Sequence, residues 1–218
     1  PTGLPFNSVI ALELHGGKPL SPLVNAGAIA TTSLINAENV EQRWQRILHI
    51  QQQLAGEQVA LSDEVNQSEQ TTNFHNRAIA WLLYSAGYLY CDAIEACDVY
   101  TRQCSTLLNT IELATLGATL AAGGVNPLTH KRVLQADNVP YILAEMMMEG
   151  LYGRSGDWAY RVGLPGKSGV GGGILAVVPG VMGIAAFSPP LDEDGNSVRG
   201  QKMVASVAKQ LGYNVFKG

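Results

Sequence analysis

The sequence has few of the features that mark nucleic-acid-binding or membrane proteins. Only 15% of its 218 residues are charged, with 14 basic and 18 acidic side chains, and the basic ones form no stripe of the kind that a polyanion requires. Its longest apolar run, 174–187, is interrupted by Pro179 and Gly180 and is shorter than the roughly 20 residues that cross a bilayer. We therefore expect no nucleic-acid partner and no membrane partner.

Cysteine and histidine are also scarce. The three cysteines, Cys91, Cys97 and Cys104, lack the C-x-x-C spacing of zinc and redox sites. The four histidines contain no H-x-x-x-H pair. We expect buried, reduced thiols in a cytoplasmic protein, with no metal site and no cofactor.

The hydrophobic pattern changes along the chain from helical to strand-like. Helices are expected from Asn25 onward and over 39–53, about 68–85, 92–100, 106–122 and 138–148, with a last helix capped by Asn196 or Ser197 and ending near Leu211. β-rich runs at 172–178 and 181–188 predict a hairpin, whereas residues 1–24, including a short alternating segment at 8–14, predict loop and sheet edge.

This order of elements predicts a single α+β domain over residues 1–218. A helical lobe would cover about 25–150, and a sheet with a closing helix about 151–218. Two strands make a poor sheet, so we expect the sheet to be incomplete in this chain and to take further strands from a segment before Pro1.

A glycine-rich segment contains Lys-Ser-Gly at the start of an expected strand. Lys167 would supply positive potential, Ser168 a hydroxyl for a substrate, and the backbone N–H of Val170 a donor to an oxyanion. Serine acyl-transfer enzymes build an active-site wall in this way, but they also need an S-x-x-K helix earlier in the chain. The S-x-x-K at Ser206 and Lys209 comes too late, and we expect both to be surface residues. By itself, the three-residue pattern Lys-Ser-Gly favours a glycine-rich turn that merely enters a strand.

Polar residues form a stripe on the helix expected over 68–85. Glu69 and Asn76 are seven residues apart, so they fall within roughly 20° of one another on one helix face, with Asn73 between them. A carboxylate and a carboxamide suit the ammonium and carboxylate of an amino acid. A solvated helix face explains the same pattern.

Tyr100 and Tyr152 are candidates for proton transfer. A tyrosine whose pKa is lowered by a nearby lysine can move a proton to and from a nucleophile. Tyr152 follows Gly150 in a glycine-bracketed break after a helix, where side chains often face a cleft. Packing is the alternative role for either tyrosine.

Together these segments resemble the serine-dependent glutaminases, a family related to the β-lactamases. The matching blocks run from Asn7 to the closing helix and include 22–28, 68–69 with 76–77, 98–100 with 104–105, 123–127, 150–152 with 155–156, 163–173, and 188–191 with 195–197. The resemblance implies a β-lactamase/transpeptidase-like α+β fold, with an antiparallel sheet flanked by helices. It also implies hydrolysis of L-glutamine to L-glutamate and ammonia through an acyl-serine intermediate, without a metal or cofactor.

The same resemblance assigns roles to individual residues. It maps the glutamine-binding positions onto Asn25, Glu69, Asn76, Tyr100, Tyr152 and, through its backbone, Val170. Tyr152, Tyr100 and Lys167 are the expected catalytic residues within this chain. Glu69 would pair with the α-ammonium group of glutamine, and Asn25 and Asn76 with its α-carboxylate.

The family's S-x-x-K helix, which carries the nucleophile, lies upstream of the Asn25 block and is absent from this sequence. The chain begins with Pro1, without a Met or an apolar signal segment. We therefore expect the C-terminal portion of a glutaminase, inactive on its own, and the resemblance makes a homodimer or homotetramer the expected assembly.

Two other functions are compatible with parts of the pattern. A penicillin-recognising acyl-serine enzyme would use the same Lys-Ser-Gly strand, although the glutaminase-like blocks weigh against it. A non-catalytic amino-acid-binding or assembly module would keep the pocket without the serine.

Overall fold

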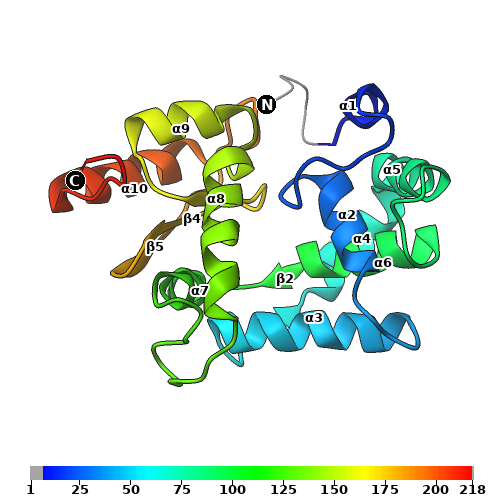
Figure 1. Cartoon of the computed structure of the whole chain (residues 1–218), viewed down its shortest axis with the longest axis horizontal. Coiled ribbons are helices and arrows are strands. Elements are labelled where there is room, and N and C mark those ends of the chain that lie inside the picture. Colours follow the sequence, from blue (N-terminus) through cyan, green and yellow to red (C-terminus); the bar gives the residue numbers. More distant parts are fainter. Residues whose placement is uncertain (1–6, 218) are drawn as a thin grey trace. The chain divides into compact units, whose positions relative to one another are not determined.

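The computed structural model describes residues 7–217, which group into two compact units (Figure 1). Residues 7–51 and 58–107 form the first, here called the helical unit, and residues 52–57 and 108–217 form the second, the sheet unit. The lobe boundary predicted near residue 150 does not coincide with this division, because the helices over 110–149 belong with the sheet.

Helices make up most of the helical unit. They are α1 (Val9–Leu14), α2 (Asn25–Ser33), α3 (Val40–Ala55, whose last turn belongs to the sheet unit), α4 (Asp63–Thr72), α5 (Phe74–Ser85) and α6 (Ala93–Cys104). Two-residue strands β1 (Ala60–Leu61) and β2 (Thr106–Leu107) pair antiparallel. Within the part of the chain that the structure describes, no helix is long and apolar enough to cross a bilayer.

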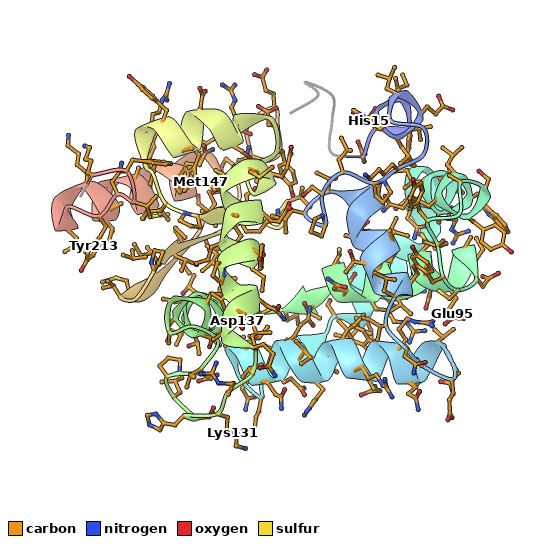
Figure 2. The ribbon with its side chains drawn as sticks, viewed as in Figure 1. His15, Glu95, Lys131, Asp137, Met147 and Tyr213 are labelled. Carbon is orange, nitrogen blue, oxygen red and sulfur yellow. The ribbon has the colours of Figure 1, made fainter. Side chains whose placement is uncertain are left out.

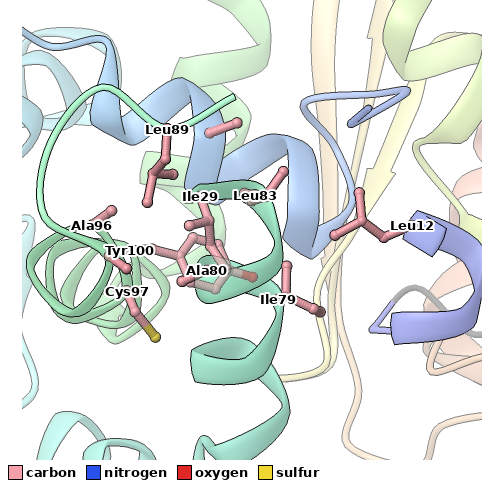
Figure 3. Close-up of a cluster of buried hydrophobic side chains, with 11 residues drawn as sticks. Leu12, Ile29, Ile79, Ala80, Leu83, Leu89, Ala96, Cys97 and Tyr100 are labelled. Atoms are coloured by element: carbon pink, nitrogen blue, oxygen red, sulfur yellow. The ribbon is translucent and has the colours of Figure 1, made fainter. Parts of the chain in front are cut away.

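The core of the helical unit lies where α2, α5 and α6 meet. Figure 3 shows the ring of Tyr100 beside Ile29 and Ala80, with Ile79 and Leu83 in the same buried cluster. Burying such side chains contributes about 1.5–3 kcal/mol each. Tyr100, only 9% exposed, is therefore held by apolar packing over most of its ring.

Two predictions for the helical unit are wrong. The segment expected to be loop and sheet edge contains α1, which begins because Ser8 Oγ accepts a hydrogen bond from the Ala11 N–H at 3.2 Å. The single helix expected over 68–85 is two helices that meet at Asn73 (φ −78°, ψ 37°). Glu69 and Asn76 therefore do not share one helix face.

The Asn73 side chain accounts for this break. It is buried, donates to Thr101 Oγ1 of α6 at 3.0 Å, and accepts from Nε of Arg77 at 2.9 Å. These bonds hold Asn73 against α6. The hydrophobic periodicity of the sequence gives no sign of them, because Thr101 is distant along the chain.

The sheet unit contains the remaining elements. They are α7 (Thr110–Ala121), the 3-10 turn η1 (Ala136–Asn138), α8 (Val139–Glu149), the 3-10 turn η2 (Tyr152–Arg154), α9 (Ser155–Arg161), β3 (Gly166–Ser168), β4 (Gly173–Val178), β5 (Met182–Phe187) and α10 (Val198–Leu211). The helix predicted over 106–122 begins only at Thr110, because Thr106 and Leu107 form β2 and Asn109 caps α7 with Glu112.

The described sheet is antiparallel, with strand order β3-β4-β5 and a helix on each face. Val204 and Ala208 of α10 pack in one cluster with Ile174. On the other face α7 approaches so closely that a Cβ atom on Gly183 would overlap the backbone of Ala114. This arrangement confirms the predicted α+β class with a helix-flanked antiparallel sheet.

The loop between α7 and α8 is fixed at its base. Asn126 is 2% exposed, its Nδ2 donates to the Gln53 carbonyl at 2.9 Å, and its Oδ1 accepts from the Leu128 N–H at 2.9 Å. Farther along the loop, Lys131 points away from the ribbon (Figure 2). Asn126 thus stabilises the fold at a distance along the chain from the predicted site residues.

The three cysteines all lie within the described residues, and none of them forms a disulfide bond. Cys97 is buried, but Cys91 is half-buried and Cys104 is exposed, so the expectation of buried thiols is correct for Cys97 alone. Burial raises the pKa of the Cys97 thiol to about 11.

Candidate functional site

Three of the predicted site residues meet in the helical unit. The Tyr100 hydroxyl donates to Asn25 Oδ1 at 3.0 Å, and Asn25 Nδ2 donates to Asn76 Oδ1 at 2.7 Å. The three side chains come from α6, α2 and α5, so the packing of these helices positions them. Here they are called the asparagine cluster.

The asparagine cluster has the features of a carboxylate site. The amide nitrogen of half-buried Asn76 donates to no residue that the structure describes, so its N–H groups are available to a ligand. Asn25 is the first residue of α2, whose N-cap Val24 makes no side-chain capping bond. The uncapped N–H groups and the helix dipole favour a negative charge at this end.

Behind the cluster, a polar network fixes the junction of α4 and α5. Arg77 donates from Nη2 to the Gln70 carbonyl at 2.8 Å, and Gln70 Nε2 donates to Asp98 Oδ1 at 2.8 Å. Glu69 lies beside Gln70 on α4 and is exposed, and its carboxylate has no hydrogen bond to any other described residue. The structure therefore leaves Glu69 outside the hydrogen-bonded cluster.

Tyr152 and Lys167 meet in the sheet unit and form the second site group, called the tyrosine–lysine pair. Lys167 Nζ lies 4.5 Å from the centroid of the Tyr152 ring. Lys167 Nζ also donates to the Ser168 carbonyl, and the Tyr152 hydroxyl donates to the same oxygen at 3.4 Å. The ammonium group therefore lies over the face of the Tyr152 ring, in a cation–π contact, and beside the oxygen that accepts from the Tyr152 hydroxyl.

Around this pair, the backbone at the end of α8 lies in close contact with β3. Tyr152 has a φ of 53°, in the left-handed region that a side chain disfavours. The Ser168 N–H donates to the Gly150 carbonyl at 2.9 Å. A Cβ atom on Gly150 would overlap the carbonyl oxygen of Gly166, so only glycine lets the end of α8 approach β3 this closely.

Ser168 does not have its predicted role. Its side chain is 2% exposed, and its Oγ donates to Asn196 Oδ1 at 2.5 Å. The hydroxyl is therefore committed to an internal hydrogen bond and is not presented to a substrate. Asn196, expected only as a possible helix cap, is fully buried, and Ser197 caps α10 instead.

Val170 lies in the exposed turn between β3 and β4. The turn is closed by bonds from the Gly169 N–H to the Gly173 carbonyl (3.0 Å) and from the Gly172 N–H to the Gly169 carbonyl (2.9 Å). No hydrogen bond joins the Val170 N–H to another described residue, which leaves it available as a donor.

The S-x-x-K residues of α10 are on the surface, as predicted. Ser206 and Lys209 are both exposed, and Ser206 Oγ accepts a hydrogen bond from Gln210 at 3.0 Å. They lack the burial and the neighbouring proton acceptor that an activated serine needs.

Two cavities, one in each unit, have linings that include none of the predicted site residues. One of about 200 Å³ in the helical unit is lined by residues that include Pro19, Tyr88 and Tyr90. Another of about 290 Å³ in the sheet unit is lined by residues that include Trp158, Arg161 and Lys202.

Known proteins of one family match this chain over almost its whole length. The family model described as Glutaminase matches residues 1–216. The chain is 98% identical over 218 residues to Glutaminase 1 of Escherichia coli O6:H1 and 73% identical over 217 residues to Glutaminase of Desulfovibrio desulfuricans, covering 70% of each relative and all of itself.

Solved structures of glutaminases have the same fold. A probable glutaminase of Bacillus subtilis superimposes with a TM-score of 0.95 at 34% identity, covering 99% of this chain and 73% of that one. A covalent complex of a Bacillus subtilis glutaminase with 5-oxo-L-norleucine, formed by reaction with 6-diazo-5-oxo-L-norleucine, superimposes with a TM-score of 0.87 at 31% identity, covering 97% and 79%.

Proposed function

Because the chain belongs to the glutaminase family, we propose that its two site groups serve the hydrolysis of L-glutamine to L-glutamate and ammonia. The observation that carries this proposal is the hydrogen-bonded order Tyr100–Asn25–Asn76 at the uncapped start of α2. It offers amide donors and a helix dipole to an amino acid's carboxylate.

The asparagine cluster binds the amino-acid end of glutamine. Asn76 Nδ2 and the first turn of α2 hold the α-carboxylate. The Tyr100 hydroxyl donates a hydrogen bond to Asn25 Oδ1 and so fixes the orientation of the Asn25 carboxamide. Glu69, exposed and negatively charged, pairs with the α-ammonium group.

The tyrosine–lysine pair moves protons. Once the Tyr152 hydroxyl has released its own proton to solvent, Lys167 stabilises the negative charge on the phenol oxygen, and Tyr152 accepts the proton of a serine hydroxyl as the serine oxygen attacks the carboxamide carbon. The proton then passes to the leaving nitrogen, which departs as ammonia, and water hydrolyses the acyl-serine. Tyr100, whose hydroxyl donates to Asn25, is assigned to orientation rather than proton transfer.

The Val170 N–H stabilises the oxyanion that forms during both steps. Its place in a short glycine-closed turn presents the N–H without requiring a side chain. One such donor is worth roughly 10²–10³ in kcat.

The nucleophilic serine is proposed to lie outside these 218 residues, because the S-x-x-K found here is at exposed Ser206 and Lys209. The covalent complex formed by the Bacillus subtilis glutaminase supports a nucleophilic route. The protein as made in the cell, treated with 6-diazo-5-oxo-L-norleucine and digested, should carry the label on a serine followed three positions later by lysine. A label on a serine of this chain would contradict the assignment.

The activity itself is tested by ammonia and glutamate release from L-glutamine, with D-glutamine and L-asparagine as comparison substrates. We expect turnover of L-glutamine by the protein as made in the cell and none by a polypeptide of these 218 residues alone. Absence of turnover by the former would overturn the proposed function, and full turnover by the latter would overturn the placement of the nucleophile.

We also propose a homo-oligomer, a dimer or a tetramer, as the family resemblance implies, and a cytoplasmic location, where the cysteines would stay reduced. Light scattering of the purified protein should give two or four times the mass of one chain. A mass equal to that of one chain would contradict this assembly.

A further inference from the structure

Asn196 is fully buried between two segments that are far from it in sequence. Its Nδ2 donates to the Leu151 carbonyl at 3.2 Å, and its Oδ1 accepts from Ser168 Oγ at 2.5 Å. One carboxamide therefore joins the turn after α8 to strand β3. Both bonds are shielded from water, which makes the loss of either partner costly.

These two segments carry the tyrosine–lysine pair. Leu151 directly precedes Tyr152, and Lys167 directly precedes Ser168. The Ser168 carbonyl is also the oxygen to which both the Tyr152 hydroxyl and Lys167 Nζ donate. Holding Leu151 and Ser168 thus fixes the backbone from which both reacting side chains extend.

Asn196 is itself held in place. Its backbone N–H donates to Asp192 Oδ1 at 2.9 Å, and the other oxygen of Asp192 accepts from Gln201 at 2.9 Å. On the exposed side of the same loop, Arg154 Nε donates to Asp194 Oδ2 at 2.8 Å. The loop is therefore joined to the Tyr152 turn by a buried hydrogen bond from Asn196 and by an exposed one from Arg154.

We propose that Asn196 is a positioning residue for the proton-transfer pair Tyr152 and Lys167 and acts through its bonds to Leu151 and Ser168. The inference rests on the proposed function. This position requires a carboxamide, because the Leu151 carbonyl needs a donor and the Ser168 hydroxyl needs an acceptor. An aspartate offers acceptors only and would face the Leu151 carbonyl with a second oxygen. Tyr152 also has a left-handed backbone conformation, which is strained and persists only where neighbouring residues hold it in place.

The test substitutes Asn196→Asp in the protein as made in the cell, with Asn126→Asp as the matched control. Asn126 is an equally buried asparagine of the same unit that also donates to a carbonyl. We expect Asn196→Asp to lower kcat about 10- to 100-fold, the effect of a displacement of about 1 Å, and to change KM less than about threefold. Asn126→Asp should lower the unfolding temperature while leaving kcat within about threefold.

A double-mutant cycle separates positioning from simple loss of stability. If Asn196 acts through Tyr152, the Asn196→Asp substitution will change kcat little in a Tyr152→Phe background. Equal effects in both backgrounds would overturn the inference. A Tyr152→Phe variant with unchanged kcat would instead overturn the proposed role of Tyr152 in proton transfer.

A second pair of variants covers the case in which Asn196→Asp does not fold. Ser168→Ala removes the hydroxyl that donates a hydrogen bond to Asn196 Oδ1, whereas Ser168→Thr keeps a hydroxyl at this position. We expect kcat to fall at least tenfold in Ser168→Ala and to be restored in Ser168→Thr. Equal kcat in the alanine variant and the unchanged protein would contradict the inference.

Discussion

The carboxamides of Asn25 and Asn76 are joined by a hydrogen bond, with 2.7 Å between Asn25 Nδ2 and Asn76 Oδ1. The bond uses the oxygen of Asn76 and so leaves its nitrogen to face a ligand. Among the described residues, that nitrogen has no other partner. The direction of one hydrogen bond thus determines which group of Asn76 can recognise a substrate.

Replacing this nitrogen tests substrate recognition. Asn76→Asp keeps the acceptor for Asn25 but loses the donor and adds a negative charge beside the proposed α-carboxylate. Loss of a hydrogen bond to a charged group corresponds to an increase in KM of about 10- to 100-fold for L-glutamine, with a smaller change in kcat. Steady-state kinetics measure it.

Asn66→Asp is the matched control, because Asn66 lies on α4 and its side-chain oxygen also accepts a hydrogen bond, from Gln70 at 3.3 Å. Its KM should stay within about twofold. An Asn76→Asp variant with an unchanged KM would exclude this residue from carboxylate binding.

The close contact of Gly150 with β3 gives a second prediction. In Gly150→Ala the added methyl group would overlap the Gly166 carbonyl, so the Tyr152 turn must move away from Lys167. We expect a loss of about 1–3 kcal/mol of unfolding free energy, the usual cost of overpacking, together with a fall in kcat of at least tenfold. Chemical denaturation and steady-state kinetics measure the two effects.

Gly156→Ala provides the comparison for this substitution. Gly156 lies in the first turn of α9, and a Cβ atom there would meet no other atom within 4 Å. Alanine favours a helix over glycine by about 1 kcal/mol, so this variant should be as stable as the original or more stable. If Gly150→Ala matches Gly156→Ala in both stability and kcat, the contact between Gly150 and the Gly166 carbonyl does not restrain the Tyr152 turn.

Much of the fold could be predicted from the sequence, because local patterns determine it. The hairpin of β4 and β5, the surface helix α3 and the closing helix α10 lie close to their predicted residues. α1 was missed because its six residues show an alternation that resembles a strand, whereas Ser8 caps them as a helix.

The parts of the site that could not be predicted depend on contacts between distant residues. Asn73 interrupts an otherwise continuous helical pattern by bonding to Thr101, 28 residues later. Ser168 appeared to face a substrate because Asn196, 28 residues later, could not be recognised as its partner. Fully buried asparagines carry no periodic signal, so only the folded chain identifies them.

The buried thiol of Cys97 gives a prediction on reactivity. Burial raises its pKa to about 11, and Asn73 Nδ2 lies 3.8 Å from its sulfur, whereas Cys104 is exposed. Since the thiolate is the reacting form, iodoacetamide at pH 8 should label Cys104 at least 10-fold faster than Cys97. Peptide mass spectrometry measures both rates, and unfolding in denaturant should make them equal.

The same shift predicts how stability depends on pH. The unfolded chain releases the Cys97 proton near its ordinary value of 9.0, below the folded value of about 11. The free energy of unfolding should therefore fall as the pH rises from about 9 to about 11. Cys97→Ala should fall less steeply over this range, and equal slopes for the two proteins would contradict the raised pKa.

The proposed mechanism depends on proton transfer by Tyr152, and one measurement tests this role directly. Tyr152→Phe keeps the ring under Lys167 Nζ but removes the oxygen that moves the proton. Kinetics of ammonia release from L-glutamine are compared with those of Tyr160→Phe, where the tyrosine is 89% exposed. We expect a fall in kcat of about 10²–10⁴-fold for Tyr152→Phe, with KM little changed, and no effect for Tyr160→Phe. A Tyr152→Phe protein that keeps its kcat would contradict this role.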